Sequence, residues 1–121
     1  DGCLPGVKCF EEKNTQFRKS AIEDESKMGP ATKLMFNTMK SSTFVSFLEE
    51  LSGIPNIIPD PHYRGSGLHF IGRGGLLGIH ADFNRYQKFG LHRRVNCFIF
   101  LNHDWKKEYG GHLELWDRSM T

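Results

Sequence analysis

The chain has 121 residues, which excludes a second full domain at roughly 100–150 residues per domain. Its 38% hydrophobic residues suffice for a small core, and its net charge of +2 suggests neither a highly charged disordered chain nor a dedicated nucleic-acid binder. Residues 1–60 hold nine acidic and seven basic residues, whereas residues 61–121 hold five acidic and nine basic ones. The basic second half favours an anionic small-molecule ligand.

The cysteine pattern and the hydropathy predict a soluble, cytoplasmic protein. Cys3, Cys9 and Cys97 leave one thiol unpaired under any scheme and show no CxxC spacing, which favours a reducing compartment. No stretch approaches the roughly 20 apolar residues of a membrane span, so no membrane partner is expected. We expect both ends of the chain to be truncated, because the chain begins at Asp1 and residues 117–121 directly follow a strand-like run.

Residues 1–60 are expected to form a helical support region. Phe10, Phe17 and Ile22 can anchor a short helix near the start. A helix beginning at Pro30 is predicted by apolar residues at helical spacing, namely Leu34, Met35, Phe36 and Met39. A second helix is predicted by the stripe of Phe44, Val45, Phe47, Leu48 and Leu51.

The ends of the second helix carry recognisable signals. Ser41 or Ser42 can cap its N-terminus, and Gly53 suits the left-handed position after its last turn. Pro55 prevents the helix from resuming.

Residues 61–121 are expected to form the first part of a β core. Short strands are predicted at 68–71 and 76–81, the second ending at Asp82, with the glycines of 72–75 forming the turn between them. The glycine spacing of this stretch does not match a phosphate-binding loop.

Two later segments read as strands. Residues 94–101 are apolar on both faces, which predicts a strand buried on both sides, and residues 112–116 form a further strand after a polar connection.

The candidate chemistry lies at His80 and Asp82. Side chains at i and i+2 of a strand point to the same face, so an imidazole nitrogen and a carboxylate would be presented together. These donors suit Fe(II), and a third ligand would complete a 2-His-1-carboxylate triad. The alternative is a structural pair in which Asp82 caps the turn toward Asn84.

Four motifs in this order resemble the 2-oxoglutarate and Fe(II)-dependent dioxygenases, and among them the prolyl 4-hydroxylase-like branch. They are GLLGIHADFN (75–84), LHRRVNCFIFLN (91–102), DW (104–105) and YGGHLELWD (109–117). The resemblance covers about residues 28–121 and implies an α+β protein. Its core would be a double-stranded β-helix, or jelly roll, incomplete at the C-terminus and preceded by N-terminal helices.

The resemblance implies an enzyme that hydroxylates a substrate C–H bond, favouring a peptidyl proline, and releases succinate and CO2. Its cofactor would be Fe(II), its cosubstrates O2 and 2-oxoglutarate, with ascorbate as an additional reductant; a peptide or small molecule would be the substrate. The family's third ligand, a distal His, and its Arg or Lys for 2-oxoglutarate have no counterpart here, because His92, His103 and His112 lie too early. A fragment inactive alone is therefore expected.

The resemblance also implies a 2-oxoglutarate pocket lined by Phe98, Phe100 and Leu113. Phe100 stands where many prolyl hydroxylases have a Tyr, so that hydroxyl contact would be absent. His69 and Asn96 are the candidate polar partners, with an ordinary role in their strands as the alternative.

The sequence is also compatible with a function other than catalysis. The basic residues between Arg85 and Arg94 can form a solvated loop or face a substrate chain. The alternative to an enzyme is a non-catalytic β-barrel module that uses this loop to bind a protein or a nucleic acid.

Overall fold

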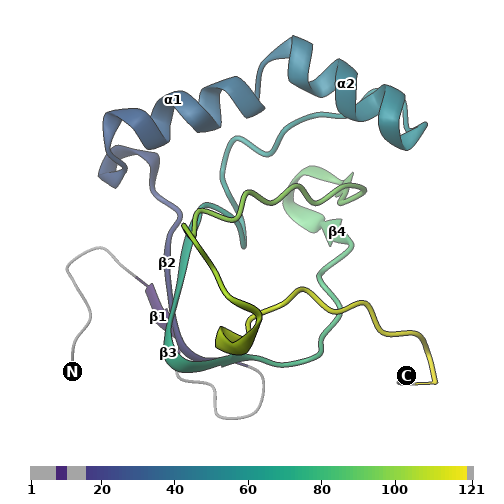
Figure 1. Ribbon diagram of the computed structural model, residues 1–121. Helices are drawn as coiled ribbons and strands as arrows, with labels where there is room; N and C mark the ends of the chain where they lie inside the picture. Colours follow the sequence, from purple (N-terminus) through teal and green to yellow (C-terminus); the bar gives the residue numbers. More distant parts are fainter. Residues whose placement is uncertain (1–7, 11–15, 120–121) are drawn as a thin grey trace. The chain divides into compact units, whose positions relative to one another are not determined.

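The structure is a computed structural model that describes residues 8–10 and 16–119 (Figure 1). The chain separates into two compact units, Asp1–Leu77 and Gly78–Thr121. The first unit contains β1 (Lys8–Phe10), β2 (Gln16–Ile22), a 3-10 turn η1 (Glu25–Lys27), α1 (Pro30–Met39), α2 (Ser42–Ser52) and β3 (Leu68–Leu77). The second contains β4 (Arg85–Tyr86), η2 (Gln87–Phe89), β5 (Leu91–His92) and η3 (Lys107–Tyr109).

Both predicted helices are confirmed. α1 begins with Pro30 at its first position, where the missing N–H has no intrahelical partner to lose. The Ser41 hydroxyl caps α2 by accepting from the Phe44 N–H at 3.3 Å, which decides between the two candidate serines. Gly53 ends α2 in the left-handed conformation with φ of 68°.

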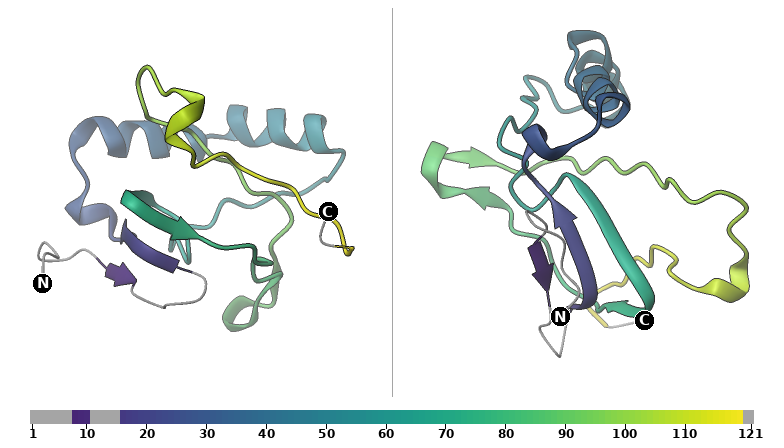
Figure 2. Two further views of the ribbon diagram at one scale, coloured as in Figure 1. Left: turned by 60° about the horizontal axis from the view of Figure 1, so that its bottom comes forward. Right: turned by 90° about the vertical axis from the view of Figure 1, so that its left-hand side faces the viewer.

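The short helix predicted around Phe17 and Ile22 is wrong, because this stretch is strand β2. β2 lies between β1 and β3 in an antiparallel sheet of order β1-β2-β3, and Figure 2 shows it beside β3. Ile22 pairs with Leu68, and Gln16 pairs with Leu77. The partner strand lies about fifty residues later in the chain, and tertiary pairing of this kind overrides a weak local helix pattern.

The glycine turn predicted at residues 72–75 is also wrong, because β3 runs through it. Phe17 pairs with Leu76 and Lys19 with Ile71, so the glycine-rich stretch bulges out of the ladder instead of reversing the chain. Gly74 (φ 71°) and, across the ladder, Arg18 (φ 52°) take left-handed conformations. The Arg18 guanidinium Nη1 donates to the Arg73 carbonyl at 2.8 Å, which ties the bulge to β2.

A small polar and aromatic cluster fixes the helices of the first unit to the chain that follows them. The Tyr63 ring is 6% exposed and packs edge-on against Phe36, at 5.1 Å between centroids. The Tyr63 hydroxyl donates to Glu25 Oε2 at 3.3 Å, and Lys40 Nζ lies 3.2 Å from the same oxygen. The Tyr63 hydroxyl and the Glu25 carboxylate together raise the pKa of Lys40.

The second unit differs most from the predicted strands. β4 and β5 form a short antiparallel hairpin whose turn ends at Gly90 in the left-handed conformation. The strands predicted at 76–81, 94–101 and 112–116 are not formed as such: only residues 76–77, at the end of β3, are in a strand. Figure 1 accordingly draws most of the later chain as a trace without arrows.

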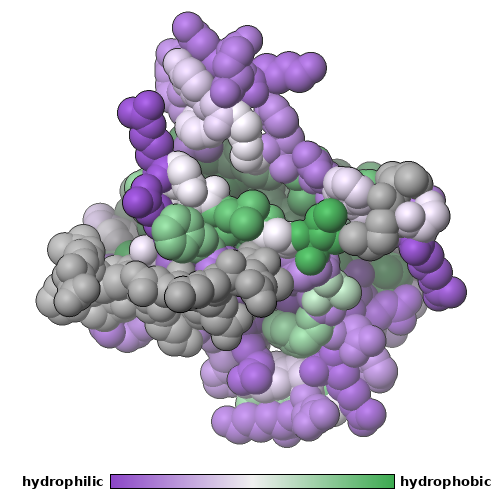
Figure 3. Space-filling model, turned by 90° about the horizontal axis from the view of Figure 1, so that it is seen from below, coloured by the Kyte–Doolittle hydropathy of each residue, from purple (hydrophilic) through white to green (hydrophobic). Residues whose placement is uncertain are grey.

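The reason is that a strand is completed by a hydrogen-bonded neighbour, and no described segment pairs with residues 94–101 or 112–116. Their apolar side chains are consequently exposed, with Phe100 at 67% and Leu115 at 91%. Apolar side chains reach the surface between polar ones in Figure 3. Among residues 16–119 the buried apolar side chains are Ala21, Met28 and Tyr63, all in the first unit.

The described residues form two α-helices and two small antiparallel sheets, which confirms the α+β class. The described residues do not form a closed jelly roll, and the division of roles at residue 60 stays a prediction. None of the helices formed by the described residues is long and apolar enough to cross a membrane.

Candidate metal centre

His80 and Asp82 present their side chains toward each other. His80 Nε2 lies 3.4 Å from Asp82 Oδ1, although the backbone here is irregular rather than a strand. Two ligands at about 2.1 Å from a first-row metal and about 90° apart are separated by roughly 3 Å. The predicted proximity of the two atoms is therefore confirmed, while the strand that was expected to produce it is not.

A backbone contact orients the His80 ring. His80 Nδ1 lies 2.7 Å from the carbonyl oxygen of Gly78, a contact that requires Nδ1 to carry a proton and donate it. In the neutral imidazole, Nε2 then holds a lone pair directed toward Asp82 Oδ1. At this distance a protonated ring forms an ion pair with Asp82, whereas a neutral ring and the carboxylate are two donors that one divalent metal can share, so the donor set fits a divalent metal.

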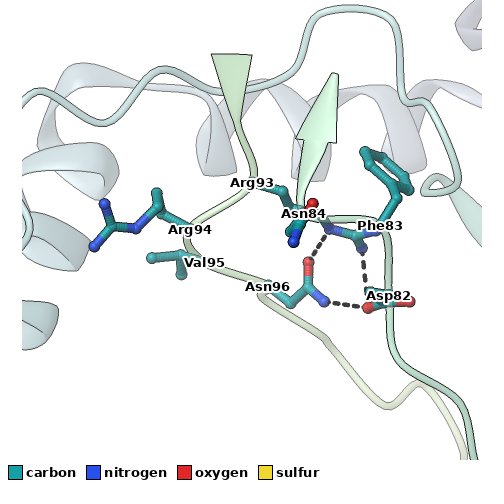
Figure 4. A pocket seen from close by; sticks show the side chains of 7 residues that line it. All are labelled: Asp82, Phe83, Asn84, Arg93, Arg94, Val95 and Asn96. Atoms are coloured by element: carbon teal, nitrogen blue, oxygen red, sulfur yellow. Dashed lines mark hydrogen bonds and ion pairs between the residues drawn. The ribbon is translucent and has the colours of Figure 1, made fainter. Parts of the chain in front are cut away.

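The other oxygen of Asp82 is held by two side chains, as Figure 4 shows. Asn96 Nδ2 donates to Asp82 Oδ2 at 2.6 Å, and Arg93 Nη2 lies 3.4 Å from the same oxygen. Arg93 Nε in turn donates to Asn96 Oδ1 at 2.6 Å. The three side chains form a closed ring of contacts that leaves Oδ1 facing His80.

The hairpin of β4 and β5 explains how Arg93 reaches this ring. Beyond the pair Arg85–His92, the Arg93 N–H donates to the Asn84 carbonyl at 2.9 Å, so the ladder continues by one bond. The Arg93 guanidinium also lies over the Phe83 ring, 4.6 Å from its centroid. The sequence predicts a loop at residues 85–94 and therefore does not predict this role for Arg93; the available turn signal is Gly90, which lies between two apolar residues.

The motif around Trp105 closes a second small loop in this unit. The Trp105 indole N–H donates to the Gly110 carbonyl at 2.8 Å, and its ring packs edge-on against Tyr109 at 5.3 Å. Gly110 and Gly111 both have positive φ, of 71° and 73°. Glycine is favoured at both positions because a side chain there would be strained.

The residues predicted to line a 2-oxoglutarate pocket are not gathered into one by the described structure. Phe98, Phe100 and Leu113 are all more than half exposed. Asn96 is engaged by Asp82 and Arg93. His69 belongs to β3 in the first unit, where loss of hydration beside β2, reinforced by the charge of Lys19, lowers its pKa. Their roles toward 2-oxoglutarate stay predictions.

A third metal ligand is not assembled here. No group of three His, Cys, Asp or Glu side chains that could hold a metal occurs within the described part of the chain. His103 Nδ1 contacts its neighbour Asp104 at 2.6 Å, and His112 Nε2 lies 3.2 Å from the Lys107 carbonyl. His80 and Asp82 would therefore supply two of the three protein ligands of a 2-His-1-carboxylate site for Fe(II).

Comparison with known proteins gives one match. Residues 66–121 match the family model described as the 2OG-Fe(II) oxygenase superfamily. No curated protein and no solved structure matches the chain. The superfamily implies Fe(II) as cofactor and 2-oxoglutarate and O2 as cosubstrates, and the matched segment contains His80, Asp82, Arg93 and Asn96. The match covers less than half of the chain and supports a relationship between the part that carries the candidate metal centre and the 2OG-Fe(II) oxygenase superfamily.

Proposed function

We propose that the chain is part of an Fe(II)- and 2-oxoglutarate-dependent dioxygenase in which His80 and Asp82 are two of the three iron ligands. The observation that carries this is the approach of His80 Nε2 to Asp82 Oδ1 at 3.4 Å, inside the segment that matches the superfamily. Bound iron would supply the chemistry that couples oxidation of 2-oxoglutarate, giving succinate and CO2, to hydroxylation of a substrate C–H bond.

The protein's own part is to orient the two donors. The Gly78 carbonyl holds the proton of His80 on Nδ1, which keeps Nε2 available as a ligand. Because the described residues offer two ligands, we expect the 121-residue chain to bind metal weakly and to be inactive alone.

The favoured substrate is a peptidyl proline, a choice supported by the motif resemblance to the prolyl 4-hydroxylase-like branch. In that reading Phe98, Phe100 and Leu113 would line the cosubstrate pocket, His69 remains a candidate polar partner, and ascorbate would serve as a reductant. The exposed state of the three apolar residues leaves them accessible for such a role.

The alternative function, a binding module that uses the basic residues from Arg85 to Arg94, is weakened by one contact. Arg93 is engaged by Asp82 and Asn96, so it is committed to the candidate metal centre. An oxygenase accounts for this contact, whereas a module binding an acidic partner does not need it.

Metal binding tests the proposal directly. Mn(II), an EPR-visible substitute for Fe(II), is titrated into the chain with and without 2-oxoglutarate. We expect weak binding that 2-oxoglutarate strengthens, since the cosubstrate supplies further metal ligands. His80→Ala and Asp82→Ala should abolish it, and His103→Ala, at the second His–Asp contact, should not. Equal binding by the wild type and both alanine variants of the centre would overturn the proposal.

A further inference from the structure

We infer that Asn96 is a positioning residue that, together with Arg93, fixes which oxygen of Asp82 faces the metal. This inference rests on the proposed function, because it assigns Asp82 Oδ1 to the metal. The ring in Figure 4 contains one carboxylate, one carboxamide and one guanidinium. Neither Asn96 nor Arg93 would itself contact iron.

The orientation of Asn96 is determined by its neighbours. A carboxylate only accepts hydrogen bonds, and a guanidinium only donates them. Asn96 must therefore turn its Nδ2 toward Asp82 and its Oδ1 toward Arg93, which are the contacts found, both at 2.6 Å. Reversing the amide would set donor against donor and acceptor against acceptor.

The same contacts restrict Asp82. Its side chain is 41% exposed, so without partners the carboxylate could rotate and exchange its two oxygens. Asn96 and Arg93 both engage Oδ2, whereas His80 Nε2 lies next to Oδ1. The carboxylate is thereby prepared to bind a metal through one oxygen, which leaves more coordination positions open than binding through two.

Arg93 is held in place from three sides. Its backbone N–H is bonded to Asn84, its guanidinium lies over Phe83, and its Nε donates to Asn96. Arg94, the next residue, turns its side chain away from Asp82 in Figure 4. The chain therefore offers a neighbouring arginine of equal charge as a matched control.

The first test needs no metal. The side-chain amide signal of Asn96 in a ¹H–¹⁵N NMR spectrum, assigned by its loss in Asn96→Ala, is followed in variants of its partners. Asp82→Ala and Arg93→Gln should each shift that signal, and Arg94→Gln should leave it in place. A signal that moves in neither partner variant would overturn the inference.

The second test uses Mn(II) alone. Loss of an outer partner of a metal ligand typically lowers affinity about 10- to 100-fold, so Asn96→Ala should weaken Mn(II) binding at least about tenfold. Asn102→Ala should change it less than about twofold, because Asn102 is not part of the ring. Asn96→Gln, which keeps the amide, should recover part of the loss. Equal affinity in Asn96→Ala and Asn102→Ala would overturn the inference.

The two proposals fail in different ways. Mn(II) binding that persists in His80→Ala and Asp82→Ala contradicts the proposed metal centre. The amide signal of Asn96 then tests by itself whether Asp82, Asn96 and Arg93 form the ring of contacts. Binding that depends on His80 and Asp82 but not on Asn96 supports the centre and overturns the positioning role.

Discussion

At the scale of single residues, the chemistry depends on which atoms of His80 and Asp82 are already engaged. His80 uses Nδ1 on the Gly78 carbonyl, and Asp82 uses Oδ2 on Asn96 and Arg93. The remaining atoms, Nε2 and Oδ1, lie 3.4 Å apart. Outer contacts of this kind set the orientation and the tautomer of metal ligands.

Lengthening the carboxylate side chain should disturb this arrangement. Asp82→Glu moves the carboxylate by one methylene, so it cannot keep both the Asn96 contact and the approach to His80. We expect Mn(II) affinity to fall about tenfold or more, measured by EPR titration. Asp104→Glu, at the other His–Asp contact, is the matched control, and an equal change in both variants would contradict the account.

His69 gives a prediction about pH. Its pKa lies below the ordinary histidine value of 6.5, because loss of hydration and the charge of Lys19 disfavour the protonated ring in the folded state. The folded state is therefore penalised when the ring protonates: its stability is retained above about pH 6.5 and falls as the pH drops through the lowered pKa. Thermal melts between pH 7.5 and about pH 5 should show a smaller decrease for His69→Gln than for the wild type. A decrease of the same size in His69→Gln and His62→Gln would count against this assignment.

At the scale of elements, the β2–β3 pair depends on the glycines of its bulge. A Cβ on Gly75 would lie 2.5 Å from Ile71 Cγ2 and 2.7 Å from the Gly72 carbonyl oxygen. The contact with backbone cannot be relieved by a rotamer change, so the bulge would have to shift.

Gly75→Ala should therefore lower the free energy of unfolding by about 1–3 kcal/mol. Gly72→Ala is the control, because a Cβ there has no neighbour closer than 3.7 Å and φ is not positive. Urea unfolding followed by circular dichroism measures both. Equal stabilities of the two variants would show that the bulge does not need a glycine at position 75.

At the scale of the whole molecule, the sequence predicts local features better than long-range ones. The helices, a serine cap at position 41 or 42 and the role of Gly53 follow from signals within a few residues. The approach of His80 to Asp82 was also predictable, because it depends on residues two apart. β2 was not, because its partner β3 lies far along the chain.

The candidate metal centre shows the same contrast between local features, which the sequence predicts, and long-range contacts, which it does not. The two candidate ligands are two residues apart in sequence, whereas Asn96 and Arg93 reach Asp82 through the β4–β5 hairpin, where the sequence predicts a loop. The strand expected at 94–101 has the right composition, but strand formation also requires a partner, and none of the described segments supplies it.

The exposed apolar residues of the second unit have a consequence in solution. Phe98, Phe100 and Leu115 are each more than half exposed, and apolar surface of this extent promotes association. We expect the weight-average mass in analytical ultracentrifugation to rise with protein concentration. Phe98→Ser with Phe100→Ser should reduce the rise, whereas Ser42→Ala, on α2, should not. A mass independent of concentration in the wild type would contradict this expectation.

Binding of a divalent metal by His80 and Asp82 together is tested most directly by the map of Mn(II)-induced line broadening in the ¹H–¹⁵N NMR spectrum of the chain. We expect the backbone signals of residues 78–84 and 93–96 to broaden first, and this pattern to disappear in His80→Ala. Broadening centred instead on His103 and Asp104, or a pattern unchanged in His80→Ala, would contradict this expectation.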